Sequence, residues 1–186
     1  MARLSGTRIA VVGSTGCGKS TLARELAQRL GVPHIELDSL FWGPGWSETP
    51  DHEFRRRVEA AASGDRWVID GNYSRVRDVV WSRAQTVVWL DYAFPVPAWR
   101  LLVRTIRRSA RREELWSGNR ESWRRSFLSR DSILLWLLRS FRRHRRDIES
   151  AMHDPAYSSI RIVRLRSPRA AEQWLAGVPS AVEAHA

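Results

Sequence analysis

Lysine, cysteine and long apolar runs are scarce in this sequence. Its 186 residues include one lysine, Lys19, and one cysteine, Cys17. A single cysteine excludes an internal disulfide framework and any zinc site built on several cysteines. No apolar run approaches the ~20 residues that a membrane-spanning helix needs, and the apolar stretch at residues 9–12 is too short for a signal peptide. These absences predict a cytoplasmic protein without a membrane span.

Arginine replaces lysine almost everywhere. It supplies 30 of the 31 basic side chains, against 20 acidic ones, and the formal net charge is +11. Residues 100–146 hold 15 arginines and four acidic residues, so this segment carries the whole excess. Blocks of basic residues suit phosphates, nucleic acid or an anionic membrane surface. The alternative interpretation is a general arginine preference on exposed helices.

Five short segments rich in β-branched residues are predicted to be strands. They lie at residues 8–12, 34–37, 66–69, 86–90 and 160–165. Helical patterns separate most of them, for example Leu22, Leu26 and Leu30, followed by Gly31 as a C-terminal stop. Further helices are expected at about 50–62 and 170–175. This alternation predicts an α/β fold, a parallel sheet with helices on both faces.

One helical stretch, at about residues 97–152, interrupts the alternation and contains the arginine-rich segment. We expect one domain over residues 1–177, with this stretch as a helical excursion or lid, and a flexible tail at 178–186. Its second helix, at about 131–149, places apolar residues and His144 on one face. Packing of that face on the sheet is the favoured interpretation, with a membrane surface as the alternative.

Residues 13–21 directly follow the first predicted strand and read G-x-x-x-x-G-K-S, a phosphate-loop motif flanked by a strand and an amphipathic helix. Its glycines let successive backbone N–H groups turn toward phosphates, and the helix N-terminus adds partial positive charge. Lys19 is predicted to contact the β- and γ-phosphates, and Ser20 to coordinate Mg²⁺. The predicted nucleotide-binding residues here are Gly13, Ser14, Thr15, Gly16, Cys17, Gly18, Lys19, Ser20 and Thr21.

Two details of the motif sharpen this prediction. In a chain that otherwise uses arginine, lysine at position 19 indicates a need for a compact ammonium beneath the phosphates. Cys17 occupies a variable position of the motif and is interpreted as a small filler, not a nucleophile. ATP or GTP binding is therefore the firmest expectation from the sequence.

Aspartates end two of the predicted strands. Asp70 follows the third strand, at the edge where open α/β sheets bind ligands, and is predicted to join Ser20 at the Mg²⁺. The alternative is that Asp70 only caps the turn at Gly71 and Asn72. Asp38 ends the second strand and is predicted to orient a hydroxyl of the phosphate acceptor.

Segments after these aspartates supply candidate acceptor contacts. Residues 39–46 are rich in aromatics that either cover an acceptor or simply pack in the core. Residues 71–77 supply an amide, a phenol, and the guanidiniums of Arg75 and Arg77, a set suited to an anionic acceptor. Surface solvation is the competing account for both arginines.

The first helix of the arginine-rich segment has two contrasting faces. Apolar residues at 102, 106 and 110 define one face, and four arginines share the other: Arg104, Arg107, Arg108 and Arg111. A stripe of guanidiniums is able to close over a transferring phosphoryl group and expel water. The same stripe also suits a nucleic-acid backbone.

The chain resembles the adenylate-kinase-like P-loop proteins over about residues 8–175. The resemblance rests on residues 13–21, on Asp-Gly-Asn-Tyr at 70–73, on the strand ending at Asp91 and on the arginine helix. Within that family it is similar to the small bacterial branch labelled DNA topology modulation protein, which residues 115–121 also resemble. The family implies a three-layer P-loop NTPase fold with a five-stranded parallel sheet of order 2-3-1-4-5 and a lid.

The resemblance also implies site residues. Arg104 is expected near the adenine ring, Arg108 near the transferring phosphate, and Ser167 in the turn that borders the adenine. Where adenylate kinases have Gly-Phe-Pro-Arg, this chain has Gly-Asn-Tyr-Ser at 71–74, and the segment between strands two and three is short. The resemblance therefore supports ATP as donor and leaves the acceptor open.

The sequence thus predicts a Mg²⁺- and ATP-dependent phosphotransferase acting on a small acceptor. Its predicted catalytic residues are Lys19, Arg104, Arg108 and Asp38, and its predicted metal ligands are Ser20 and Asp70. The alternative hypothesis is a nucleotide-binding regulator or ATPase that holds nucleic acid through residues 100–146.

Overall fold

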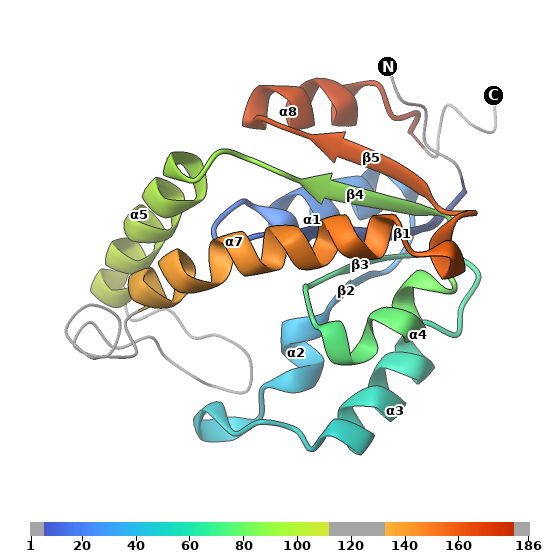
Figure 1. Ribbon diagram of the computed structural model, residues 1–186, viewed down its shortest axis with the longest axis horizontal. Helices are drawn as coiled ribbons and strands as arrows, with labels where there is room; N and C mark the ends of the chain where they lie inside the picture. Colours follow the sequence, from blue (N-terminus) through green and yellow to red (C-terminus); the bar gives the residue numbers. More distant parts are fainter. Residues whose placement is uncertain (1–5, 112–132, 181–186) are drawn as a thin grey trace.

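A five-stranded parallel sheet forms the centre of the molecule (Figure 1). The computed structural model describes residues 6–111 and 133–180, without the side chains of 108–111 and 133–139. The strands are β1 (Arg8–Gly13), β2 (His34–Glu36), β3 (Trp67–Asp70), β4 (Thr86–Leu90) and β5 (Arg161–Leu165). Their order in the sheet is β2-β3-β1-β4-β5, and every neighbouring pair is parallel. The predicted strands and the order implied by the resemblance are confirmed.

Helices connect the strands in the alternating manner that the sequence predicts. They are α1 (Lys19–Leu30), α2 (Leu37–Phe41), α3 (Asp51–Ala61), α4 (Arg77–Trp81), α5 (Pro95–Arg111), α7 (Ile133–Met152) and α8 (Pro168–Ala176). Short 3₁₀ turns occur at Pro44–Trp46, Ser74–Val76 and Pro155–Tyr157. Of the helices in the described ranges, none combines the length and apolar character that crossing a bilayer requires.

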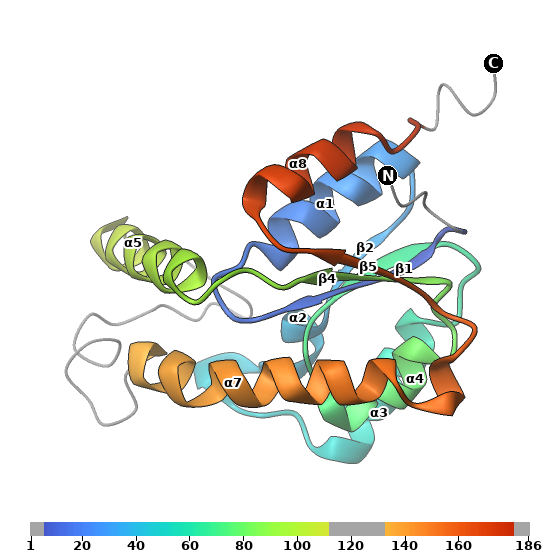
Figure 2. The same ribbon diagram turned by 45° about the horizontal axis from the view of Figure 1, so that its top comes forward.

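The sheet lies between two layers of helices (Figure 2). Helices α1 and α8 cover one face, and α3, α4 and α7 lie on the other. Side chains alternate along each strand, so Val11 and Val68 join the core under α1 while Ala10 and Ile69 join the core under α4. Burial on both faces explains why the strands read as continuous apolar runs.

The second strand is shorter than predicted, which changes the setting of Asp38. Strand β2 ends at Glu36, and Leu37 begins the short helix α2, so Asp38 lies in the first turn of a helix, and its predicted place at a strand end is wrong. The physical reason is the spacing of Leu37 and Phe41, which are both buried and lie one helical turn apart.

Helix α7 packs on the sheet face, as its apolar pattern predicts. Ile148 is buried in the core beneath it, and Phe141 meets Phe94 edge to face, with ring centroids 5.2 Å apart. The predicted face also includes residues 133 and 137, whose side chains lie outside the described set.

Helix α5 buries a face that its apolar pattern does not reveal. Leu101 and Thr105 are fully buried, while Ile106 is 46% exposed. The phosphate loop explains this choice, because a Cβ at Gly16 would lie 2.4 Å from the Pro97 carbonyl oxygen and 3.1 Å from the Leu101 Cβ. The missing side chain at Gly16, which has a φ of +83°, lets the loop and the helix approach this closely.

This packing makes a testable distinction between two apolar residues of α5. Leu101→Ala is expected to lower the free energy of unfolding by about 2–5 kcal/mol, because it removes a buried side chain and leaves a cavity. Ile106→Ala is expected to change it by only about 0.5 kcal/mol, because its side chain is largely in water. Urea unfolding followed by tryptophan fluorescence measures both, and equal effects would contradict the orientation of α5.

Candidate nucleotide and acceptor site

A cavity of about 1040 Å³ opens at the carboxyl edge of the sheet. Its walls come from the phosphate loop, the start of α1, the segment around α2, the β3–α4 connection, α5, α7 and one face of α8. This is the edge at which open α/β sheets bind ligands. The cavity therefore lies where the sequence predicts the nucleotide and the acceptor.

The phosphate loop forms one wall of the cavity. Of the predicted residues of the loop, those from Thr15 to Thr21 line the cavity, and Gly13 and Ser14 do not. Gly18 has a φ of +95° and precedes α1 without a side-chain cap. The first N–H groups of this 12-residue helix are thus presented at the cavity, where an anion is stabilised. The Lys19 ammonium donates to the Ser14 carbonyl oxygen at 3.3 Å, within the loop itself.

Asn72 holds the base of the loop, a role that the sequence does not reveal. The Gly13 N–H donates to Asn72 Oδ1 at 3.1 Å, and Asn72 Nδ2 donates to the Gly13 carbonyl oxygen. Gly13 has a φ of +151°, and a Cβ there would lie 2.7 Å from the Leu90 carbonyl oxygen. The amide predicted to bind the acceptor therefore fixes the loop to the β3–α4 connection.

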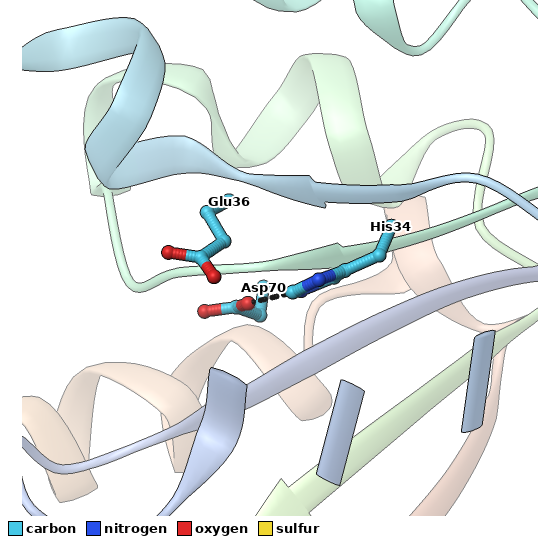
Figure 3. Close-up of side chains that lie close together, drawn as sticks. All are labelled: His34, Glu36 and Asp70. Carbon is cyan, nitrogen blue, oxygen red and sulfur yellow. Dashed lines mark hydrogen bonds and ion pairs between the residues drawn. The ribbon is translucent and has the colours of Figure 1, made fainter. Parts of the chain in front are cut away.

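Ser20 and Asp70 come together as predicted. The Ser20 hydroxyl donates to Asp70 Oδ1 at 3.0 Å, and Asp70 is only 4% exposed. The second carboxylate oxygen, Oδ2, lies 2.7 Å from His34 Nε2 (Figure 3). Asp70 thus has partners on α1 and β2, which disfavours the interpretation of a simple turn cap. His34 was not predicted, because its contact with Asp70 follows from the pairing of β2 with β3 and from no sequence motif.

Asp38 and Tyr73 form a hydrogen-bonded pair on the acceptor side. The Tyr73 hydroxyl donates to Asp38 Oδ1 at 2.6 Å, and both residues line the cavity. Burial, together with the negative charge of Asp38, raises the pKa of the Tyr73 phenol far above its ordinary value. The phenol therefore stays protonated at neutral pH and keeps donating to Asp38.

The aromatic segment after Asp38 divides between the core and the wall of the cavity. Phe41 is buried and contacts the rings of Phe54 and Tyr73. Trp42 and Trp46 line the cavity, with their rings edge to face at 5.6 Å. One member thus packs in the core, and two form an apolar wall.

The two arginines after β3 point to different places. Arg75 lines the large cavity, pairs with Asp51 and stacks over the Phe41 ring at 5.2 Å. Arg77 lines a second cavity of about 300 Å³ between α4, α7 and the sheet, and lies 5.6 Å from the Trp81 ring. Only Arg75 shares the cavity of the phosphate loop.

The arginine stripe of α5 reaches the cavity in part. Arg104 lines it, Arg107 is exposed, and the side chains of Arg108 and Arg111 lie outside the described set. Arg100 also lines the cavity, and its Nη1 donates to the Cys17 carbonyl oxygen at 3.0 Å. This arginine was not predicted, although its position four residues before Arg104 places both on one helix face.

Helix α8 closes the cavity on the side of the phosphate loop. Ser167 caps this helix, because its hydroxyl oxygen accepts from the Ala170 N–H at 3.2 Å. The following Pro168 and Glu172 line the cavity. The structure thus gives Ser167 a capping contact, next to residues that line the cavity.

A buried carboxylate, Asp91, pairs with one of the arginines of α7. Asp91, directly after β4, is 7% exposed and accepts from Arg145 Nη2 at 3.1 Å and from Arg164 Nη2 at 2.6 Å. Arg164 also pairs with Glu149, at 3.0 Å. This network ties α7 to β4 and β5, so at least one arginine of the basic segment compensates an internal charge.

His144 of α7 lines both cavities. Burial, followed by the positive charges of Lys19 and Arg143, lowers its pKa below the ordinary value. The imidazole is therefore neutral at neutral pH. His144 thus lies on the face of α7 that is turned toward the two cavities.

With this geometry described, the comparisons with known proteins add a family. The family model described as AAA domain matches residues 9–122, more than half of the chain. The chain belongs to the AAA domain family. The matched segment of this AAA domain contains the phosphate loop, Asp38, Asp70 and the whole of α5. No match was found among curated proteins.

Solved kinase structures share the fold of this AAA domain. Shikimate kinase from Bacteroides thetaiotaomicron is 16% identical, with a TM-score of 0.57 over 92% of this chain and 96% of that one. A gluconokinase from Sinorhizobium meliloti 1021 is 23% identical, with a TM-score of 0.52 over 94% of each chain. These matches support a P-loop kinase-like fold. The narrower resemblance to the DNA topology modulation branch stays a prediction.

Cys17 offers a direct test of the loop's packing. Burial raises the pKa of its thiol, which favours the neutral thiol over the reactive thiolate. We expect modification by Ellman's reagent at pH 8 to be at least about tenfold slower in the folded protein than in guanidinium. Since the chain has one cysteine, the measured absorbance reports this site alone. Equal rates in the two states would contradict the buried placement.

Proposed function

We propose that this AAA domain is a phosphotransferase that moves the γ-phosphoryl group of Mg²⁺-ATP to a hydroxyl of a small acceptor. The observation that carries the proposal is a single cavity that contains both Lys19 with the loop and the Asp38–Tyr73 pair. A phosphotransferase needs a donor site and an acceptor site that open into one another. The kinase-like fold agrees with this reaction class.

The donor half of the cavity suits a nucleoside triphosphate. Backbone N–H groups at the start of α1 and the Lys19 ammonium bind phosphate oxygens, and Arg100 and Arg104 add positive charge from α5. ATP is the donor that the family resemblance favours. Pro168 and the start of α8 form the neighbouring wall, where we place the base.

Ser20 and Asp70 fit a magnesium ion, because both present oxygen atoms next to the phosphate loop. When bound, Mg²⁺ supplies positive charge that offsets the developing charge on the phosphate oxygens. The chain's own contribution is to hold the hydroxyl and the carboxylate in a fixed relation before the nucleotide arrives.

The acceptor half of the cavity suits a compact, hydroxylated molecule. Asp38 Oδ1 accepts from Tyr73, and the remaining lone pairs of this carboxylate are available to accept from an acceptor hydroxyl. Trp42 and Trp46 provide an apolar wall beside it. Asp38 thus orients the attacking oxygen and takes up its proton as the phosphoryl group transfers.

The arginine-rich segment is assigned to the same reaction. We propose that the helical excursion at residues 97–152 supplies the lid of a domain spanning 1–177, with Arg104, Arg107, Arg108 and Arg111 closing over the phosphates. Arg100 and Arg104 already face the cavity, and Arg145 is engaged by Asp91. The alternative of a regulator or ATPase that binds nucleic acid predicts a steep loss of affinity with salt.

Lys19 provides the first test of the proposed activity. Lys19→Met is expected to reduce transfer of label from γ-labelled ATP by about 10²-fold or more, because it removes the cation that offsets charge on the transferring group. The assay uses Mg²⁺ and a panel of sugars, hydroxy acids, nucleosides and nucleoside monophosphates, with thin-layer separation of products. Arg56→Met, an exposed cation on α3, is the matched control and should keep wild-type activity.

Two outcomes of this assay would contradict the proposed phosphotransferase activity. Full transfer in Lys19→Met would exclude the phosphate loop as the donor site. Label that appears only as inorganic phosphate, for every member of the panel, would favour an ATPase.

Asp38 provides a test of the acceptor half. Asp38→Asn is expected to lower kcat by about 10²–10⁴-fold, because the amide cannot take up the acceptor proton. The KM for ATP should stay within about twofold, since the donor half is unchanged. Asp65→Asn, whose side chain is 99% exposed, is the control. A normal kcat in Asp38→Asn would remove Asp38 from the mechanism.

A further inference from the structure

One feature of the site is still unexplained: His34 contacts Asp70, which with Ser20 forms the proposed metal-binding pair. Strand β2 lies parallel to β3 with Glu36 opposite Asp70 and His34 opposite Val68. Because side chains alternate, His34 and Glu36 lie on the same side of β2, while Ile35 packs in the core on the other side. Asp70 lies two residues after Val68, which belongs to the core under α1. All three side chains therefore face the start of α1.

These three side chains form a compact group (Figure 3). One atom able to ligate a metal, from each of His34, Glu36 and Asp70, lies within 4.8 Å of the others. His34 and Asp70 are largely buried, with side-chain exposures of 15% and 5%. Figure 3 shows the imidazole reaching one Asp70 oxygen and the Glu36 carboxylate turned toward the same residue. Glu36 lines the cavity, so the group lies at its wall.

Asp70 is held at both oxygens by different elements. Oδ1 accepts from the Ser20 hydroxyl on α1 at 3.0 Å, and Oδ2 lies 2.7 Å from His34 Nε2 on β2. Two bonds at opposite oxygens prevent the carboxylate from rotating about its last torsion. The imidazole must donate through Nε2 to make its bond, because a carboxylate only accepts.

The direction of the Ser20–Asp70 hydrogen bond determines which side of the Ser20 hydroxyl faces the cavity. The Ser20 O–H proton points at Asp70, so the oxygen lone pairs are free to face the cavity, where Ser20 is a lining residue. A divalent cation binds a hydroxyl through those lone pairs, and a proton turned toward the cavity would repel it. The orientation of Ser20 therefore depends on Asp70, and that of Asp70 depends on His34.

We propose that His34 is a positioning residue for the divalent-cation site, acting through Asp70 on the Ser20 hydroxyl. The proposal rests on the proposed function for the presence of a cation. Imidazole is a poor ligand for Mg²⁺, which prefers oxygen atoms, so His34 acts from behind the ligands. Partners of this outer kind typically change metal affinity by about 10–100-fold when they are removed.

The test separates cation binding from nucleotide binding. Titration calorimetry measures ADP binding by each variant in EDTA and across a range of Mg²⁺ concentrations. His34→Leu removes the donor while keeping the bulk, and should raise the Mg²⁺ concentration needed for half-maximal enhancement by about 10–100-fold. Its affinity for ADP in EDTA should stay within about twofold, because the loop and Lys19 are unchanged.

Two polar variants distinguish a role of His34 in positioning Asp70 from a role in filling space. The amide nitrogen of Gln lies about as far along the side chain as Nε2, so His34→Gln should restore most of the Mg²⁺ response. The amide of Asn stops nearer the backbone, so His34→Asn should behave like His34→Leu. This pair keeps the test decisive if the leucine variant fails to fold. His52→Leu, an exposed histidine on α3, should match the wild type.

Each outcome either supports or overturns the role of His34. Equal loss of ADP affinity with and without Mg²⁺ would overturn the proposal and indicate a structural role for this residue. The proposal also fails if His34→Gln and His34→Asn behave alike at unchanged urea stability, or if wild-type ADP binding ignores Mg²⁺. A selective Mg²⁺ defect in a protein that transfers no phosphoryl group would uphold the role of His34 and overturn the proposed phosphotransferase.

Discussion

The parallel pairing of β1 with β3 is the constraint on which the site depends. In that register Val11 lies opposite Asp70, so the chain leaves β1 for the phosphate loop beside the strand that ends in the buried carboxylate. Parallel strands bring their carboxyl ends to one edge, where the helix that follows β1 begins. Ser20 on α1, Asp70 on β3 and His34 on β2 meet there because the sheet aligns the three elements.

Close contacts around the phosphate loop then couple it to its neighbours. The N–H and the carbonyl of Gly13 are both hydrogen-bonded to the Asn72 side chain. Gly16 has no side chain, so the backbone of α5 packs closely against the loop there. Arg100 adds a bond from α5 to the Cys17 carbonyl oxygen. The loop is therefore held by the β3–α4 connection and by the helix that leads into the arginine-rich segment. A movement of α5 would therefore displace the phosphate loop directly.

The arginines have several physical roles in the part of the chain that the structure describes. Arg145 and Arg164 balance the buried Asp91, which ties α7 to the sheet. Arg100 and Arg104 line the cavity and add positive charge where we propose that the polyphosphate binds. A net charge counted along the sequence treats these arginines as one block. Their separation into structural and ligand-facing groups depends on which carboxylates the fold brings near them.

The sequence by itself determined the alternating α/β fold, the phosphate loop and the meeting of Ser20 with Asp70, because these follow from local patterns and from the shared edge of parallel strands. Only the tertiary structure decided that Asn72 holds Gly13, that α5 buries Leu101 and Thr105, and that His34 contacts Asp70. Each of these depends on contacts between residues far apart in the chain. Their identity is set by register and packing, which a local pattern does not encode.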